Sequence, residues 1–138
     1  MEKIGLKSYP PGVPEKVPAP PVRSIRQMVE HRFHEYPDNP AYTNLGTTLS
    51  YRDLDELSMQ FACYLQKNLE LTPGERVAIM LPNILQDPVA MCGAFRAVLV
   101  VVNVKPLYTA RELKHQLADS GARCIVILEN FAHILEEV

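Results

Sequence analysis

The sequence predicts an α/β fold: a partial three-layer domain in which a short parallel sheet, built from two βαβ units, is flanked by helices. Three continuous β-rich runs, centred near residues 78, 101 and 125, lack the polar alternation of half-exposed strands. A segment long enough for a crossover helix separates each run from the next. A Pro-rich N-terminal arm and a small β-hairpin are expected before these units.

The first 23 residues are predicted to form the arm. Residues 8–22 hold half of the chain's twelve prolines, and proline both fixes φ and removes a backbone donor. Such a stretch favours extended, polyproline-like backbone. A docking arm or spacer is the favoured interpretation, and an SH3-type ligand is the alternative.

Local signals place the next two elements. Ser24 and Gln27 have capping-box spacing at the start of a helix that is expected to end before Pro37. Two short β-rich stretches around Gly46 then predict the hairpin.

A second, longer helix is predicted to start after Ser50, with Asp53 at its third position. The turn at Pro73-Gly74 follows it. The two crossover helices are expected over residues 84–97 and 109–119.

The segment between the last two strands has the clearest helix start and stop signals in the chain. Pro106 ends an apolar run, Thr109 and Glu112 form a T-x-x-E capping box, and Gly121 is suited to close the helix. A strand–loop–helix join of this kind lies at the carboxyl edge of a parallel sheet, where open α/β folds bind ligands.

Three polar or aromatic residues fall at this edge: Asn83, Lys105 and Tyr108. Asn83, with Gln86 three positions on, is interpreted as a helix cap. Tyr108 is interpreted as packing under the next helix, with pocket lining as the alternative. Lys105 is the one basic residue of the three.

Composition and missing motifs argue against several classes of protein. The formal net charge of −2, with both signs interspersed, gives no basic face for nucleic acid. The N-terminus lacks the apolar core of a signal peptide, and no run approaches membrane-spanning length, so a cytoplasmic protein is expected. Neither G-x-G-x-x-G nor a Walker A loop occurs.

The histidines and cysteines are interpreted as structural or solvated. His31 and His34 stand three apart beside Glu35, but a solvated helix face is favoured over a metal site. The same holds for His115, and sequence identifies no partner for His133. Cys63, Cys92 and Cys124 are odd in number and set among apolar neighbours, so buried thiols are favoured over disulfides or a metal site.

Three segments, in this order and with these gaps, carry a family resemblance: "LSYRDLDELSMQFACYLQ", "GERVAIMLPNILQDPVAMCGAFRA" and "VVNVKPLYTARELKHQLADSGA". Together they resemble the beginning of the adenylate-forming (AMP-binding) enzymes, specifically bacterial long-chain fatty-acid–CoA ligases. The resemblance covers essentially the whole chain. Residues 24–138 would then be an incomplete N-terminal subdomain of such an enzyme.

The resemblance implies a parent enzyme that activates a fatty acid with ATP and Mg²⁺ as an acyl-adenylate, which coenzyme A converts to the thioester. A nucleotide loop of the T-S-G-T-T-G-x-P-K-G type does not occur between Met1 and Val138. By residue-by-residue transfer, none of the family's catalytic, cofactor-binding or metal-binding positions falls in this chain. The chain is therefore predicted to be inactive alone, with the rest of the ligase as its partner.

Two positions depart from the family pattern. Val98 stands where glycine usually follows "RA", and Lys105 stands where asparagine is common. Because "FRAVLVVV" contains no other stop signal, the helix is expected to run through Val98 rather than to end there in left-handed geometry.

Rival interpretations remain open on sequence alone. The chain is either an N-terminal ligase fragment or a standalone α/β interaction module that has kept the fold and lost the chemistry; an independent small enzyme is disfavoured. For the fragment we expect an exposed apolar patch and self-association, a homodimer being one form. The parent enzyme would be cytoplasmic, with peripheral contact with the inner membrane as an open alternative.

Overall fold

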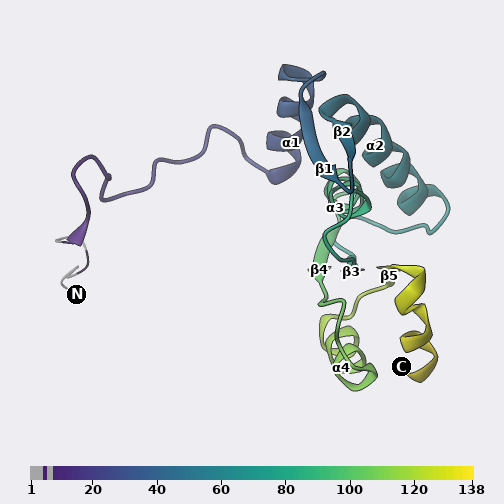
Figure 1. The fold of residues 1–138 in the computed structure, drawn as a ribbon. Helices are drawn as coiled ribbons and strands as arrows, with labels where there is room; N and C mark the ends of the chain where they lie inside the picture. The colour runs from purple at the N-terminus through teal and green to yellow at the C-terminus, as the bar shows by residue number, and fades with distance from the viewer. Residues whose placement is uncertain (1–4, 6–7) are drawn as a thin grey trace.

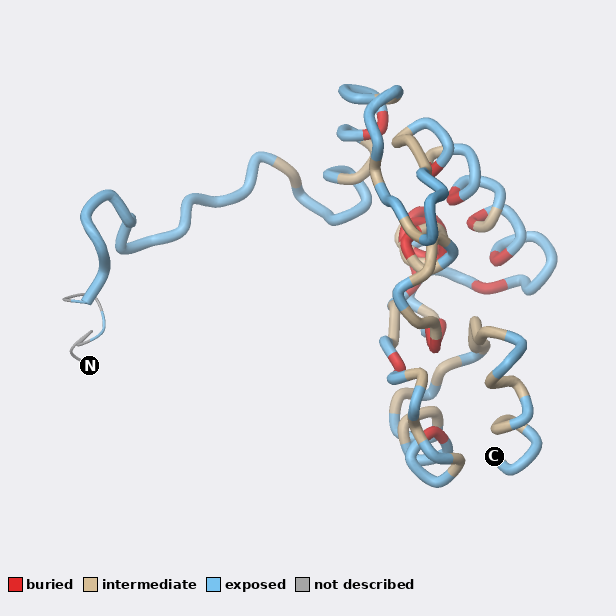
Figure 2. The backbone as a smooth tube through the Cα atoms, viewed as in Figure 1, coloured by how far each residue is buried: buried red, intermediate tan, exposed pale blue. Residues whose placement is uncertain are grey.

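A computed structural model describes residues 5 and 8–138, so most of the predicted arm and all of the folded part are covered. The arm extends away from the body, and its described residues are exposed except for Val22, which is partly buried (Figures 1 and 2). Residues 1–4 and 6–7 of the predicted arm lie outside the described part. The division into an arm of 1–23 and an incomplete subdomain of 24–138 stays a prediction.

The first helix and the hairpin form as their local signals predicted. Helix α1 spans Ile25–Glu35, and the Ser24 side chain accepts a hydrogen bond from the Gln27 N–H at its start. Strands β1 (Pro40–Asn44) and β2 (Thr47–Ser50) pair antiparallel. The turn between them has positive φ at Leu45 (47°) and Gly46 (79°), as a type I′ turn requires.

The hairpin leads directly into the longest helix, α2 (Tyr51–Lys67). Ser50 and Asp53 form a complete capping box there, as predicted. Helix α3 (Gln86–Arg96) packs against α2, and the two helices meet through small residues. An added Cβ at Gly93 would lie 3.0 Å from the Ser58 carbonyl oxygen, so only glycine fits this close approach.

The three β-rich runs form one parallel sheet, as predicted. Strand β3 (Arg76–Met80) lies in the centre, between β4 (Val100–Asn103) and β5 (Cys124–Ile127). Only β3 is buried on both faces; β4 and β5 are partly exposed. The absence of polar alternation in the three runs predicts strands buried on both faces. That prediction is wrong for the two outer strands, whose second edges have no neighbour in the described chain.

Helices cover both faces of the sheet, which gives the predicted three layers (Figure 1). Val77 faces α2 and α3 in one core cluster, while Ala78 and Met80 face the other side. Helix α4 (Ala110–Ser120) and the 3₁₀ helix η2 (Glu129–Glu137) cover that second face. A third cluster around Phe33 joins α1 and the hairpin to α2 and α3.

Helix α4 begins and ends as predicted. Thr109 and Glu112 form both bonds of the capping box, and Gly121 closes the helix with φ 63°.

The end of α3 overturns the expectation for Val98. The helix ends at Arg96 and Val98 has φ 60°, in the left-handed region. Val98 N–H donates to the Phe95 carbonyl (3.1 Å) and Leu99 N–H donates to the Ala94 carbonyl (2.9 Å), which together are a Schellman motif. Because β4 starts at Val100, the chain has to turn here even without glycine.

Candidate functional site

The carboxyl ends of the three strands meet at one edge of the sheet. In an open α/β sheet this edge is where ligands bind, so it is the candidate site of this chain. It is bounded by the loop after β3, the loop after β4 and the chain after β5, which leads into η2.

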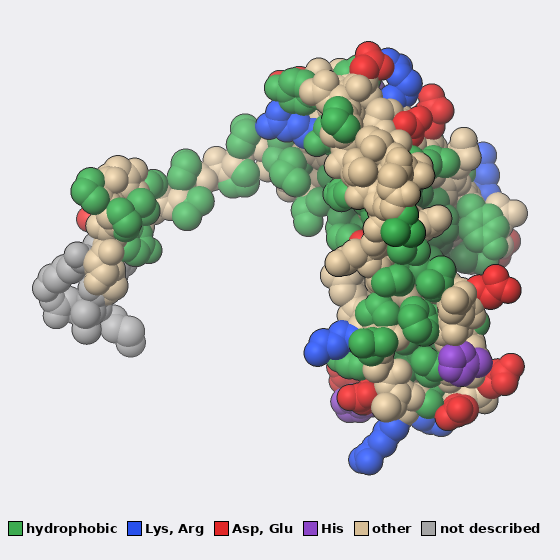
Figure 3. Space-filling view, in the orientation of Figure 1, with side chains coloured by type: hydrophobic (Ala, Val, Ile, Leu, Met, Phe, Trp, Pro, Cys, Tyr) green, Lys and Arg blue, Asp and Glu red, His purple; other side chains and the backbone are tan. Residues whose placement is uncertain are grey.

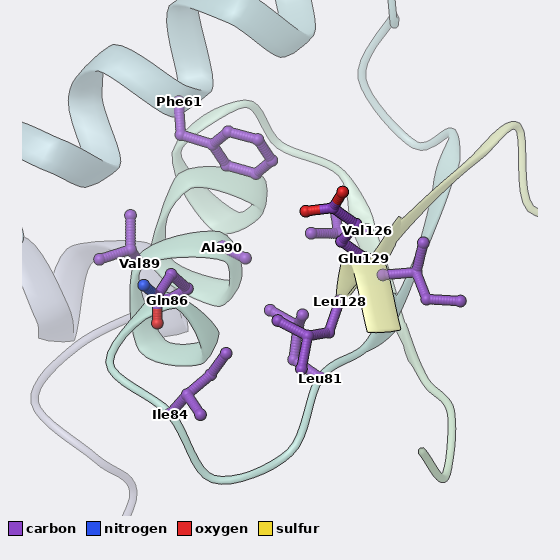
Figure 4. Close-up of a pocket in the computed structure, with 10 residues that line it drawn as sticks. Phe61, Leu81, Ile84, Gln86, Val89, Ala90, Val126, Leu128 and Glu129 are labelled. Atoms are coloured by element: carbon purple, nitrogen blue, oxygen red, sulfur yellow. The ribbon is translucent and has the colours of Figure 1, made fainter. Parts of the chain in front are cut away.

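An apolar groove opens at this edge, with a volume of about 340 Å³. Phe61 of α2 points into it from one side, and Leu81 and Val126, from the β3 and β5 sides, lie opposite (Figure 4). The remaining lining residues are Ile84, Gln86, Val89, Ala90, Ile127, Leu128 and Glu129. Since Gln86 and Glu129 are the polar side chains of this lining, the groove suits an apolar occupant.

The three edge residues singled out in the sequence do not lie together in one site. The Lys105 ammonium lies 5.9 Å from the centre of the Tyr108 ring, so these two are together. Tyr108 also packs against the core cluster under α4, which confirms the packing interpretation. Asn83 lies elsewhere: its backbone carbonyl accepts from the Asn44 side chain (2.8 Å) of the hairpin.

The capping role predicted for Asn83 is wrong. Helix α3 starts later than expected, at Gln86, and Leu85 occupies the N-cap position without a side-chain hydrogen bond. Pro88, in the first turn, has no N–H to satisfy, which lowers the need for a cap. The backbone of Asn83 instead ties the loop after β3 to the hairpin.

The histidines lie on exposed surfaces, as predicted for His31, His34 and His115. His31 Nε2 lies 3.7 Å from a Glu35 carboxylate oxygen on the solvent side of α1, and His34, His115 and His133 are exposed. Within residues 5 and 8–138, no group of three or more His, Cys, Asp or Glu side chains could hold a metal ion.

The cysteines only partly follow the prediction of buried thiols. All three are free; Cys92 is buried, Cys124 is partly buried, and Cys63 is exposed on α2, which corrects the prediction for that residue. Burial raises the pKa of the Cys92 thiol to about 11.

Sequence comparison decides the family. The family model for AMP-binding enzymes matches residues 29–138, which is most of the chain. The chain belongs to the AMP-binding enzyme family.

Relatives within the AMP-binding enzymes include bacterial ligases. Over all 138 residues the chain is 51% identical to a long-chain-fatty-acid–CoA ligase of Yersinia pestis, and it covers 25% of that protein. A protein of the same name from Bacillus subtilis is 33% identical over 128 residues. The chain thus matches the N-terminal portion of these relatives and spans about a quarter of their length.

Solved structures of AMP-binding enzymes share the fold. A benzoate CoA ligase from Burkholderia xenovorans superposes with a TM-score of 0.78 at 22% identity, over 84% of this chain and 24% of the other. A fatty acyl CoA synthetase from Mycobacterium tuberculosis gives 0.75 at 24% identity, over 81% and 22%. In the described part of the chain no helix is both long and apolar enough to cross a membrane.

A triphosphate–magnesium site, which an AMP-binding enzyme implies, does not fit the three edge residues Asn83, Lys105 and Tyr108. Such sites combine several oriented donors with a carboxylate-held cation. The predicted edge residues bring one ammonium, Lys105, close to an aromatic ring rather than to other donors.

Sequence reasoning missed two buried polar features of this AMP-binding chain. Arg96 is 8% exposed and pairs with Asp55 across the α2–α3 contact. Asp87 is partly buried beside Tyr42, and burial raises the pKa of its carboxyl group. For Arg96 the available signal was a charge inside an otherwise apolar helix, "VAMCGAFRA".

Proposed function

We propose that the chain is the N-terminal part of a long-chain fatty-acid–CoA ligase. The whole enzyme would activate a fatty acid with ATP and Mg²⁺ as an acyl-adenylate and then form the thioester with coenzyme A, in the cytoplasm. The observation that carries this proposal is the 51% identity to the Yersinia ligase along the full length of the chain.

Within that enzyme the chain would supply a framework rather than the reacting groups. Strands β4 and β5 each have one edge without a neighbour in the described residues, and Val100 on β4 is 47% exposed. Such edges invite further strands or covering helices. The apolar groove between α3 and β5 is another surface that the rest of a ligase would cover.

A chimera tests this proposal directly. The matching N-terminal quarter of the Yersinia ligase is replaced by this chain, and acyl-CoA formation is measured with ATP, Mg²⁺, palmitate and coenzyme A. We expect turnover by the chimera and none by the isolated 138-residue chain. The matched control is the chimera with Lys105→Asn, which restores the residue common in the family and should keep activity.

Two outcomes contradict the proposal. A folded chimera without turnover would favour the alternative of a standalone interaction module. Turnover by the isolated chain that survives purification and disappears in Lys105→Ala would show an independent small enzyme.

A further inference from the structure

The outer edge of β5 carries backbone groups that no strand pairs with. At the start of the β3–β5 ladder the Arg123 N–H donates to the Arg76 carbonyl (2.8 Å). Successive residues of a strand direct their N–H and C=O groups to alternate edges, so the groups of Cys124, Val126 and Leu128 point away from β3. Within the described residues, β5 has no neighbour on that side.

The outer edge of β4 is less open. The Gln116 side chain donates to the Asn103 carbonyl (2.9 Å), which closes one end of that edge. Ser24 and Ile25 line a pocket together with Val101, so the start of α1 lies beside the same edge. An exposed strand edge is a template for another strand, and proteins commonly cover such edges. The edge of β5 is therefore the one that the described chain leaves open.

The sequence of β5 is symmetric about Val126. Residues 123–129 read "RCIVILE". When two copies of this segment run antiparallel with Val126 opposite Val126, Cys124 lies opposite Leu128 and Arg123 lies opposite Glu129. Apolar residues then face apolar residues, and opposite charges meet at both ends, which stabilises cross-strand pairs. The segment is self-complementary in this one register.

Both end charges are accessible to a second copy. The Arg123 side chain is 68% exposed and reaches Glu75 through Nη1 (2.8 Å), so its other N–H groups are free to bind a further carboxylate. Glu129 is exposed and forms no ion pair within the described residues.

The apolar groove at the carboxyl edge of the sheet lies beside the same strand. Val126 and Leu128 line it together with Phe61 of α2 (Figure 4). In the space-filling view, hydrophobic side chains gather at the level of the sheet, between the hairpin and α4 (Figure 3). A strand added to β5 would cover part of this apolar surface and remove it from water.

We propose that two copies of the chain pair through the outer edges of β5, antiparallel and centred on Val126, so that their two three-stranded sheets become continuous. The Val126 N–H of each copy then donates to the Val126 carbonyl of the other, and the Leu128 N–H donates to the Cys124 carbonyl. The contact is two-fold symmetric and closed, so assembly stops at the dimer. This dimer does not rest on the proposed ligase function; the rest of a ligase would compete for the same edge.

Sedimentation of the full chain over a range of concentrations tests the proposal. Val126→Pro removes the N–H at the centre of the interface but no bond to β3, and we expect it to raise the dimer dissociation constant about tenfold or more. Val101→Pro is the matched control, because its N–H also points away from β3 but lies on β4; it should leave the constant within about twofold. A chain that stays monomeric, assembly beyond the dimer, or a dimer insensitive to Val126→Pro overturns the proposal.

A charge exchange tests the same contact without proline. Glu129→Arg and Arg123→Glu each place like charges opposite one another and should weaken the dimer, and the double variant should recover most of the loss. Glu136→Arg, at an exposed position of η2, makes the same charge change away from the edge and should have little effect. Circular dichroism confirms that every variant folds, and losses that simply add would overturn the antiparallel register.

A cross-link reads the register directly. In a Cys63→Ser background, which removes the exposed thiol, Leu128→Cys places a thiol opposite the native Cys124 of the second copy. Their Cα atoms would be about 5.5 Å apart, within reach of a disulfide, whereas the same two positions within one strand are about 13 Å apart. Mild oxidation should give a covalent dimer linked between positions 124 and 128. A dimer linked between the two positions 128 would show a different register and overturn the proposal.

Discussion

Arg96 on α3 donates hydrogen bonds both to the carboxylate of Asp55 on α2 and, at 3.1 Å, to the backbone carbonyl of the same residue. The guanidinium also lies 5.1 Å from the centre of the Phe33 ring of α1. One buried side chain therefore ties together helices α1, α2 and α3. Its Nε has no hydrogen-bond partner, and Glu30 lies 4.0 Å from it.

Removing the Asp55 carboxylate should destabilise the fold more than removing the Arg96 guanidinium. Asp55→Ala removes the hydrogen-bonded counter-charge of a buried guanidinium and leaves only the more distant Glu30 carboxylate, 4.0 Å from Nε, so we expect a loss of about 2–3 kcal/mol in the free energy of unfolding. Arg96→Met keeps the apolar stem and leaves a carboxylate that is one-third exposed, so we expect a loss below about 1.5 kcal/mol. Urea denaturation measures both, and the reverse order would contradict this account.

Val98→Gly should stabilise the fold. Relief of the positive φ at a β-branched residue outweighs the added freedom of glycine in the unfolded chain, for a net gain of about 0.5–1 kcal/mol. Val100 is the matched control, because it is equally exposed but lies in β4; Val100→Gly should lose about 1 kcal/mol. Thermal unfolding of the two variants should show shifts of opposite sign.

The parts of the fold that the sequence predicted are those decided by neighbours in the chain. Ser50 with Asp53 and Thr109 with Glu112 cap their helices through bonds that span three residues. The end of α3 was not predictable in this way. The Val98 carbonyl accepts from Gly74 (2.8 Å), a residue far away in sequence, so tertiary packing sets the turn.

The candidate site was less predictable than the fold. Parallel strands place Asn83 and Lys105 at the same edge, but the direction of the following loops decides what each residue contacts. Asn83 is held by the hairpin at Asn44, and no sequence spacing announces a contact across 39 positions. Exposure of Cys63 depends likewise on which side of α2 the rest of the chain covers.

Gly93→Ala should destabilise the α2–α3 contact. The new Cβ would lie 2.7 Å from the Phe61 ring and 3.0 Å from the Ser58 carbonyl oxygen, and the backbone atom cannot move without shifting the helix. We expect a loss of about 1–3 kcal/mol despite the better helix propensity of alanine. Adding Phe61→Ala removes the contact with the ring but not the contact with the Ser58 carbonyl oxygen. If Gly93→Ala costs no stability in the Phe61→Ala background, the role given to Ser58 is contradicted.

The three thiols should differ in reactivity. At pH 8 iodoacetamide should modify Cys63 first, because it is exposed, and Cys92 at least about tenfold more slowly. The raised pKa of Cys92, about 11, keeps it protonated at that pH, and burial limits access. Mass spectrometry of the digested protein measures the modification rate at each cysteine, and the urea-unfolded chain is the control. Equal rates for Cys63 and Cys92 in the folded protein would contradict the burial of Cys92.

The capping carboxylates should make the fold sensitive to acid. Hydrogen bonds from Ser50 and Thr109 hold the pKa values of Asp53 and Glu112 below their ordinary values of 3.8 and 4.5. A lowered pKa in the fold means that protonation favours the unfolded chain. Their stabilisation is therefore present above those ordinary values and is lost as the pH falls through the lowered ones. The double variant Asp53→Asn/Glu112→Gln should flatten the dependence of unfolding free energy on pH between about 5 and 2.

The control is Glu136→Gln, at an exposed position of η2. It removes one negative charge without removing a cap and should leave the slope nearly unchanged. Equal slopes for the cap variant and the unmodified chain would show that the caps do not control acid unfolding.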